Sequence, residues 1–453
     1  MATTMRVANA PLLVSNHLDV TGSLLSDTVV QTQSSLHVHG NLVGNLTIEM
    51  GANVIVEGFV DGKIINRGGR LVVNNNELVD LIKKSGPAEA ESGGILKINL
   101  SAIVQNWSTL AKRTAAECAA VVRADAYGCG IEIVATALAR YGCKTFFVSN
   151  IAEARGVRAA APNSVIYVLG GQYPGTAPAF AETNAQPVLR TVSEIAEWDV
   201  FVSTSGWPGG FALDVNTGKG RLGIPVEEAA VLAARSGSAS GGITLLMSHL
   251  DHATAPDHPS NVHQIKRFQE LRRIFRNVPA SLANSAGIFV GPEAHFDLVR
   301  PGSALYGINP TPGKTNPMQP VIELQARIVQ VGDLSPGDTL DFDAGWTATR
   351  KTRISIVSFG CADGYPRPDK VSKHPLQAIV GGKLCPLVGR ISMDRLAIDV
   401  SGLPDPKLAR RGDTVTLIGG PISVDDVAAA AQITGYEVLA NLRRRVHCVQ
   451  YAG

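Results

Sequence analysis

The first eighty residues repeat with a period of 18, and this repeat constrains the fold more than any other feature of the sequence. Successive units begin at Leu18, Leu36, Val54 and, in a weaker copy, Val72. Within each unit apolar residues alternate with polar ones, as in a strand with one buried face. A glycine recurs where the chain must turn a corner, at Gly22, Gly40 and Gly58. Because one such coil cannot bury its own core, residues 14–75 are predicted to form a three-sided β-solenoid of stacked 18-residue coils.

The ends of such a solenoid carry unpaired strand edges, which favour pairing with another copy. We expect residues 14–75 either to self-associate into a homopolymer or to form a short capped rod that only adds a contact to a dimer. The segment resembles a shortened bactofilin, a family of bacterial polymer-forming scaffolds. This resemblance implies a bactofilin-type partner as the alternative to self-assembly.

The pattern of apolar and polar residues changes after the repeat. Residues 76–84 have the apolar spacing of a short helix and residues 85–94 are small and acidic, which predicts a short helix and a flexible linker over 76–94. From 95 to 313, strand-like and helix-like patterns alternate about eight times, which predicts a parallel (β/α)8 TIM barrel. Residues 314–453 contain mainly strand patterns. The chain is therefore predicted to be multidomain, with a solenoid, a barrel and a mainly-β C-terminal domain.

Charge and composition exclude several classes of function. The 41 basic and 39 acidic residues leave a formal net charge of +2, without the concentrated positive charge that nucleic-acid binding requires. No window contains the roughly 18 uninterrupted apolar residues of a membrane span, and the N-terminus does not have the pattern of a signal peptide. We therefore expect a cytoplasmic protein whose six cysteines are reduced.

Six motifs in residues 95–453 follow one another in a recognisable order. They are VVRADAYGCG at 121–130, NTGKGRLG at 216–223, MSHL at 247–250, LANSAG at 282–287, RPGSALYG at 300–307, and CADGYPR followed by GRISMD. Together they resemble the motifs of the alanine racemase family, which has a fold type III barrel and a β-domain. The resemblance implies pyridoxal phosphate as the cofactor and a small amino acid as the substrate. It also implies a homodimer in which the partner's β-domain completes each active site.

The resemblance implies roles for individual residues. The family's cofactor-binding positions are matched by Tyr127, His249, Ser285, Arg300, Gly302 and Ser303. Arg221 matches the residue that orients the substrate carboxylate, and Met393 matches one that supplies a backbone amide across the dimer. Arginines and hydroxyls at a barrel mouth also form ion pairs and helix caps, so each position has a purely structural alternative.

Two catalytic positions depart from the family pattern. Arg123 stands where the resemblance implies the Schiff-base lysine, and Phe342 stands where it implies a tyrosine base. A guanidinium is not deprotonated in proteins, so Arg123 can neither condense with an aldehyde nor accept a proton. Loss of one positioned base typically lowers a rate by about 10² to 10⁴. Both residues are predicted to be non-functional for racemisation, with pyridoxal phosphate bound at most non-covalently, unless Lys219 in the NTGKGRLG motif takes over.

These observations favour a pseudoenzyme: an inactive or strongly impaired alanine racemase-like protein joined to a self-associating solenoid. Such a protein would act as a cytoskeletal scaffold in cell-wall or cell-shape organisation, at the inner face of the cell envelope. The alternative is a pyridoxal phosphate-dependent alanine racemase in D-alanine biosynthesis that uses non-standard catalytic residues. A third hypothesis is a sensor that binds the cofactor or a D-amino acid non-covalently.

Histidines cluster in the segment SHLDHATAPDHPSNVH, as His249, His252, His258 and His263. Structural zinc sites favour thiolates or two histidines one turn apart on a helix, and neither pattern is present here. We therefore predict no metal site and expect solvated loop histidines.

Overall fold

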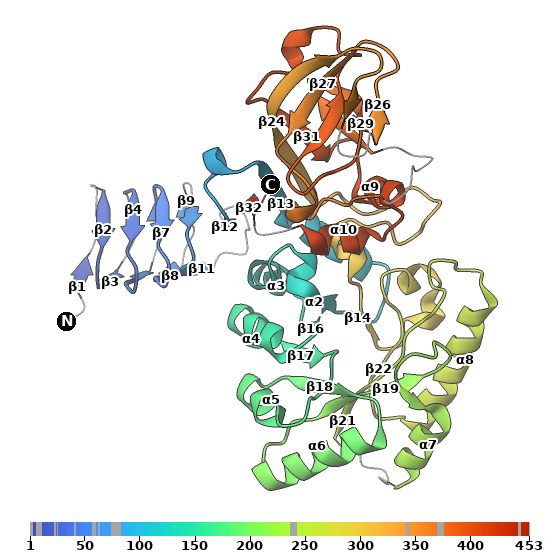
Figure 1. The fold of residues 1–453 in the computed structure, drawn as a ribbon. Coiled ribbons are helices and arrows are strands. Elements are labelled where there is room, and N and C mark those ends of the chain that lie inside the picture. The colour runs from blue at the N-terminus through green and yellow to red at the C-terminus, as the bar shows by residue number, and fades with distance from the viewer. Residues whose placement is uncertain are drawn as a thin grey trace. The chain divides into compact units, whose positions relative to one another are not determined.

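The computed structural model describes residues 3–5, 11–21, 24, 26–39, 42–56, 60–61, 64–73, 83–235, 242–340, 345–368, 376–442 and 445–452. The chain divides into two compact units (Figure 1). One consists of Ala102–Pro320, and the other combines Met1–Ser101 with Val321–Gly453.

Parallel strands stack within residues 3–73, here called the N-terminal stack (Figure 1). One ladder contains β1 (Thr3–Met5), β3 (His17–Val20), β5 (Ser35–Val38), β8 (Asn53–Val56) and β11 (Arg70–Val73). A second contains β2 (Leu12–Val14), β4 (Thr28–Val30), β7 (Leu46–Ile48) and β10 (Ile64–Asn66), and a third pairs β6 (Leu42–Val43) with β9 (Val60–Asp61). Leu18 lies beside Leu36, and Leu36 beside Val54, so an offset of 18 residues relates neighbouring strands in this part of the stack.

The last unit of the stack departs from this period. Leu71, and not Val72, lies beside Val54. Leu71 also packs against the core of the stack. The last coil is therefore one residue shorter than the 18-residue repeat predicts. Leu71 sets the register of this strand, because its side chain meets the aliphatic core.

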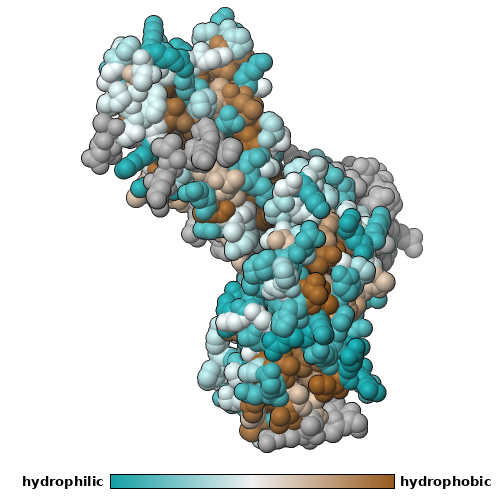
Figure 2. All heavy atoms as spheres, turned by 90° about the vertical axis from the view of Figure 1, so that its right-hand side faces the viewer, coloured by the Kyte–Doolittle hydropathy of each residue, from teal (hydrophilic) through white to brown (hydrophobic). Residues whose placement is uncertain are grey.

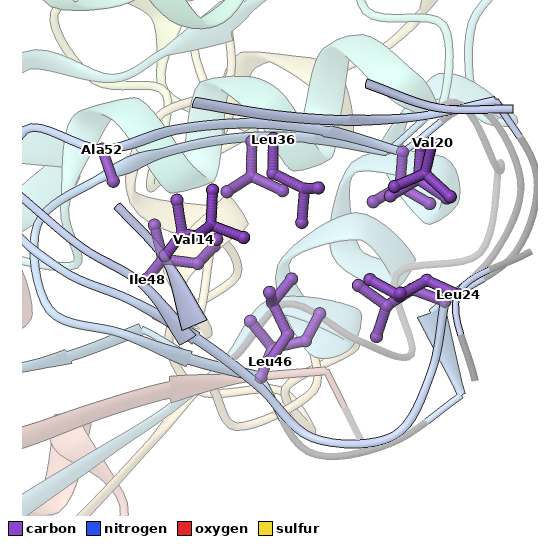
Figure 3. Packing of buried hydrophobic residues seen from close by; sticks show 13 residues of the cluster. Val14, Val20, Leu24, Leu36, Leu46, Ile48 and Ala52 are labelled. Atoms are coloured by element: carbon purple, nitrogen blue, oxygen red, sulfur yellow. The ribbon is translucent and has the colours of Figure 1, made fainter. Parts of the chain in front are cut away.

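The core of the stack is aliphatic (Figure 3). Its buried side chains are Val14, Val20, Leu24, Val30, Leu36, Val38, Leu42, Leu46, Ile48, Ala52, Val54, Val56 and Ile64. Figure 3 shows that these side chains converge from the different ladders on one interior. Since each fully buried Val, Leu or Ile contributes about 1.5–3 kcal/mol relative to an exposed one, stacking provides the burial that a single coil lacks.

Residues 83–94, where we expected the end of a short helix and a flexible linker, contain regular structure. Lys83–Ser85 form strand β12, which pairs with β10 and with β32 (His447–Tyr451), and a 3-10 helix, η1, spans Glu89–Glu91. Gly94 begins strand β13 (Gly94–Asn99), where an added Cβ would lie 2.4 Å from the Phe359 ring. The small residues thus permit close packing, which sequence composition alone does not distinguish from flexibility. Residues 76–82 of the expected helix lie outside the described part of the chain.

The unit Ala102–Pro320 contains parallel strands that follow the chain order (Figure 1). They are β14 (Glu117–Cys118), β15 (Ala120–Val121), β16 (Thr145–Val148), β17 (Val165–Val168), β18 (Gln186–Leu189), β19 (Phe211–Asn216), β21 (Ile243–Met247), β22 (Ala280–Ser281) and β23 (Leu298–Val299), with β20 (Ile224–Pro225) beside β19. The sheet closes because β14 pairs with β23, while the amide of Asp297, just before β23, donates to the carbonyl oxygen of Ala280 in β22.

Helices alternate with these strands. They are α1 (Leu100–Ala111), α2 (Arg123–Tyr127), α3 (Ile131–Arg140), α4 (Ile151–Ala160), α5 (Ala177–Thr183), α6 (Val192–Ser205), α7 (Val226–Arg235) and α8 (Pro259–Ile274). A buried cluster that includes Phe147, Tyr167, Leu245 and Met247 fills the interior of the barrel. The result is a TIM-barrel-like domain, as the alternating pattern predicts.

The C-terminal segment of the other unit is mainly β, as expected. Its strands are β24 (Ile322–Leu334), β25 (Thr339–Leu340), β26 (Trp346–Thr347), β27 (Thr352–Val357), β28 (Gln377–Val380), β29 (Lys383–Val388), β30 (Leu396–Asp399), β31 (Thr414–Ile418) and β32. This segment also contains two late helices, α9 (Val424–Ala431) and α10 (Gly435–Asn441).

The described side chains on the face drawn in Figure 2 are mostly hydrophilic, with hydrophobic ones in smaller groups between them. Among the described residues, no helix is both long and apolar enough to span a membrane.

Candidate active site

The candidate cofactor residues follow the carboxyl ends of barrel strands. Tyr127 follows β15, His249 follows β21, and Ser285 follows β22, while Arg300, Gly302 and Ser303 follow β23. Parallel strands of a closed barrel end at the same rim, which is where enzymes of this fold place reacting groups. These residues, which are far apart in sequence, therefore share one end of the barrel.

Arg300 is buried and firmly oriented at this rim. Its Nη1 donates to Ser281 Oγ at 2.5 Å, and its Nη2 donates to the Ser248 carbonyl oxygen at 2.6 Å. Burial lowers the pKa of Arg300 to about 10, and the nearby Asp214 carboxylate opposes that shift. The guanidinium thus stays charged at neutral pH. Its orientation is fixed by Ser281, which belongs to β22, and by Ser248, which follows β21.

His249 is neutral at physiological pH. Burial lowers its pKa to about 3, and the positive charges of Lys219, Arg300 and Arg221 add to the effect. Its Nε2 lies 3.2 Å from Nδ2 of Asn284, whose Oδ1 accepts the Gly287 amide at 2.9 Å. Since Nδ2 can only donate, Nε2 of His249 accepts, and the ring proton sits on Nδ1.

Hydroxyls and backbone amides gather around Gly302. Ser285 Oγ accepts the amides of Gly302 at 2.9 Å and Ala304 at 3.2 Å. A Cβ added at Gly302 would lie 2.5 Å from the Tyr127 hydroxyl, so glycine is needed for this approach. The 3-10 helix η4 begins at Ser303. Polar hydrogens at the start of a helical turn suit a bound phosphate, so the residues present fit the phosphate of pyridoxal phosphate.

Arg123 begins a segment with unusual backbone geometry. Ala124, Asp125, Ala126 and Tyr127 all have φ between 54° and 56°, the left-handed region that residues with a Cβ seldom adopt in succession. The Glu153 carboxylate anchors the segment, because its Oε1 accepts the Ala124 amide at 2.8 Å and its Oε2 accepts the Ser149 amide at 2.7 Å. The Arg123 side chain is exposed, while Tyr127 is buried.

Lys219 lies in the loop that follows β19. Asn216 Oδ1 accepts the amides of Gly218 and Gly220, each at 3.1 Å, and so shapes the loop on both sides of the lysine. Desolvation is the main cause that lowers the pKa of Lys219. The positive charge of Arg221 adds to it, and that of Arg123 has a smaller effect in the same direction. The acidic groups Asp251 and Asp214 act in the opposite direction.

Asp214 supplies a carboxylate to this cationic rim. Its Oδ2 lies 3.5 Å from Nε of Arg190, and both side chains are mostly buried. Burial raises the pKa of Asp214, while Arg190 and Arg300 act in the opposite direction. The sequence did not predict this pairing of Asp214 with Arg190.

The remaining predicted positions are Phe342, Met393 and Arg221. Phe342 lies outside the described residues. Met393 belongs to the other unit, where its side chain is 67% exposed and its carbonyl oxygen accepts the Ala362 amide at 3.0 Å. Arg221 follows β19 with an exposed side chain, consistent with a residue that meets a ligand from solvent.

Sequence reasoning missed one group of possible ligands altogether. Asp19, His37 and His39 place their side-chain ligand atoms within 4.8 Å of one another on the N-terminal stack. The sequence contains a signal for this group, because residues 19 and 37 are separated by one 18-residue repeat and so lie on neighbouring coils.

Comparison with known proteins identifies the family. The sequence model described as "Alanine racemase, N-terminal domain" matches residues 98–310, and that described as "Alanine racemase, C-terminal domain" matches residues 321–450. A protein named alanine racemase from Methylobacterium sp. (strain 4-46) is 46% identical over 359 residues, which cover 79% of this chain and 98% of that protein. This chain belongs to the alanine racemase family.

Other members support the same assignment. A protein from Mesorhizobium japonicum named "Alanine racemase, catabolic" is 41% identical, over 80% of this chain and 94% of its own length. A solved structure of alanine racemase from Bartonella henselae with covalently bound pyridoxal phosphate is 32% identical, with a TM-score of 0.75. It matches over 80% of this chain and 100% of the solved one. The alanine racemase fold, a TIM-barrel-like domain followed by a β-domain, is thus confirmed.

The expectation of an inactive scaffold is wrong. Relatives 46% identical to this chain along nearly their whole length are named alanine racemase, which supports an active racemase over a pseudoenzyme. The cytoskeletal role and the bactofilin-type partner have no support, since the family matches cover residues 98–310 and 321–450. The location at the cell envelope depended on that resemblance and has no other basis. Two substituted positions therefore do not decide the function of this whole active site.

Proposed function

We propose that this chain is a pyridoxal phosphate-dependent alanine racemase that uses non-standard residues at two catalytic positions. The observation that most supports this proposal is the match to alanine racemases over 98% of their length at 46% identity. The arrangement of Arg300, His249 and Ser285 at one rim of the barrel agrees with it, because drift in an abandoned site would not preserve their hydrogen bonds.

The residues around Gly302 would hold the cofactor. The Tyr127 and Ser285 hydroxyls and the Ser303 amide, next to Gly302, suit its phosphate, and the oriented guanidinium of Arg300 suits the pyridine nitrogen. When bound, pyridoxal phosphate supplies an electron-withdrawing ring that stabilises the negative charge left when the substrate's Cα loses a proton. The solved relative from Bartonella henselae carries this cofactor covalently, which favours a covalent link here over the non-covalent binding first expected.

We propose Lys219 as the amine for that link and as a proton acceptor. An amine must be neutral to act as a nucleophile or a base, and the desolvation and neighbouring arginines that lower the pKa of Lys219 increase its neutral fraction. Arg123 itself contributes to this lowering. In this arrangement Arg123 activates another residue's amine by its charge, although it can perform neither task itself.

The remaining residues bind and orient the substrate. Arg221, exposed at the rim, would pair with the substrate carboxylate in the bidentate geometry that guanidinium groups favour. His249, neutral and fixed by Asn284, adds no positive charge that would compete with Arg300. These roles require only residues that the structure places after neighbouring barrel strands.

Borohydride trapping tests the cofactor link. Full-length protein is incubated with pyridoxal phosphate, reduced with borohydride, digested and analysed by mass spectrometry. We expect the label on the peptide that contains Lys219. The Lys219→Met variant should lose the label and its reducible absorbance, whereas Lys266→Met, which changes an exposed lysine of α8, should keep both.

Activity is measured separately as D-alanine formed from L-alanine. Arg123→Lys restores the residue type implied by the family and should raise the rate by about 10² or more, since one positioned base typically contributes that factor. A wild-type protein that forms no D-alanine at any cofactor concentration contradicts the proposed function. A label on another lysine, with racemisation intact, contradicts only the assignment of Lys219.

We also propose that residues 14–75 are a β-solenoid of 18-residue coils and that the protein acts as a homodimer. The in-register pairing of β3 with β5 and of β5 with β8 supports the first proposal. The exposed Met393, which matches a position implied to act across a dimer, supports the second.

A further inference from the structure

Histidine and carboxylate side chains converge on the outer face of the N-terminal stack. Asp19 on β3 lies directly beside His37 on β5 in the parallel register, and His39 follows two residues later. Alternate residues of these strands point into the core, because Val20, Leu36 and Val38 are buried. The side chains of Asp19 and His37 therefore project outward together.

The distances in this cluster suit a metal ion. Asp19 Oδ1 lies 3.5 Å from His37 Nδ1 and 3.2 Å from His39 Nε2. Ligand atoms about 2.0–2.1 Å from a tetrahedral zinc ion are roughly 3.3 Å apart, because this is the edge of such a tetrahedron. The two separations from Asp19 Oδ1 are close to that edge. All three ligand atoms lie within 4.8 Å of one another.

The Asp19 carboxylate adds an independent observation. Its Oδ1 is shielded from solvent and has no hydrogen-bond partner among the described residues, although both ring nitrogens approach it. A buried carboxylate oxygen normally accepts a hydrogen bond or binds a cation. A cation between the three ligand atoms would give this oxygen a partner.

We propose that Asp19, His37 and His39 bind a divalent transition-metal ion, with Zn²⁺ as the best match to two imidazoles and one carboxylate. Three protein ligands leave one position for water. His17 lies beside the cluster, with Nε2 4.0 Å from Asp19 Oδ2 and Nδ1 2.5 Å from Ser35 Oγ. The ion would connect two successive coils and so stabilise the stack.

Metal binding is tested on the full-length protein after treatment with a chelator. Calorimetric titration with Zn²⁺ measures affinity, and the visible absorption of Co²⁺ reports tetrahedral nitrogen and oxygen ligands. We expect one ion per chain at this site. His37→Ala and Asp19→Asn should each weaken binding by more than about 100-fold, because each removes a ligand.

His258→Ala is the matched control. The His258 ring stacks on His252 at 3.8 Å, and His252 Nδ1 lies 3.0 Å from Asp251 Oδ2, so this barrel cluster has similar chemistry outside the stack. This variant should bind Zn²⁺ as the wild type does. Far-UV circular dichroism of the metal-free variants checks that each one folds.

Two results would overturn the proposal. One is equal Zn²⁺ affinity in the wild type, His37→Ala and Asp19→Asn, which would place any bound ion elsewhere. The other is a wild type that binds no Zn²⁺ and shows no tetrahedral Co²⁺ spectrum, which would leave ordinary ion pairs between the histidines and Asp19. Racemase activity enters neither measurement, so this proposal and the proposed function can fail independently.

Discussion

At the residue scale, burial and neighbouring charges set the protonation states at the barrel rim. Arg300, His249 and Lys219 all have a lowered pKa, and burial is the largest cause in each case. The three residues nevertheless differ in charge, since His249 is neutral at pH 7 and Arg300 is not. The family resemblance indicated Arg300 and His249, but only the folded environment shows which of them carries a proton.

The lowered pKa of His249 predicts how the free energy of unfolding depends on pH. Its pKa is about 3 in the folded protein and near 6.5 in the unfolded chain, so its stabilising contribution is complete above about pH 6.5 and decreases as the pH falls toward 3. His249→Gln removes this dependence. Between pH 7 and pH 5 the variant should gain about 2 kcal/mol in free energy of unfolding relative to the wild type.

Urea unfolding at several pH values measures that difference. His263→Gln, which changes an exposed histidine of α8, is the control and should follow the wild-type curve. Parallel curves for His249→Gln and the wild type would show that His249 protonates equally in both states.

At the element scale, the left-handed segment after Arg123 depends on one side chain from a neighbouring helix. Glu153 of α4 accepts amides of Ala124, Asp125 and Ser149. Four consecutive residues with positive φ need such support, because each costs about 1–2 kcal/mol relative to the right-handed form. Sequence patterns cannot show this, since Ala124 and Ala126 are ordinary helix formers.

Glu153→Ala should therefore lower the free energy of unfolding by about 1–3 kcal/mol, because it leaves backbone amides without a charged acceptor. Glu182→Ala is the matched control. Glu182 lies 3.3 Å from Arg155 in an exposed ion pair, which contributes at most about 1 kcal/mol. Chemical denaturation measures both variants. Equal losses would mean that Glu153 is no more than another surface carboxylate.

Elements at the other end of the chain show a different limit of sequence reasoning. The repeat correctly predicts the offset between β3, β5 and β8, whereas the weaker fourth unit is one residue out of register. Gly93 and Gly94, interpreted as linker, pack against Ser358 and Phe359. Glycine is compatible with flexibility and with close packing, and only the neighbouring side chains decide between them.

At the scale of the whole molecule, the proposed homodimer makes each active site depend on two chains. Arg221→Ala disables substrate binding at the barrel, and Met393→Pro removes the backbone amide expected to act across the dimer. Each variant alone should be inactive. When the two are co-expressed, half of the dimers are mixed and one of their two sites is intact, so about a quarter of the activity should return.

The D-alanine formed by the purified mixture checks this expectation, and sedimentation confirms the dimer. The control is the double variant with both changes in one chain, which has no intact site in any combination. If the mixture stays as inactive as the double variant, each chain completes its own site.

The sequence alone determined which residues could take part and what class of fold they build. Its ordered motifs indicate the alanine racemase family, and the alternation of apolar residues predicts the barrel, the β-domain and the stacked strands. Tertiary structure decided the rest, because distance and burial set how groups act on one another. Only folding brings Lys219 within reach of the charge of Arg123, gives His249 its neutral state, and places Asp19 between two histidines of the next coil.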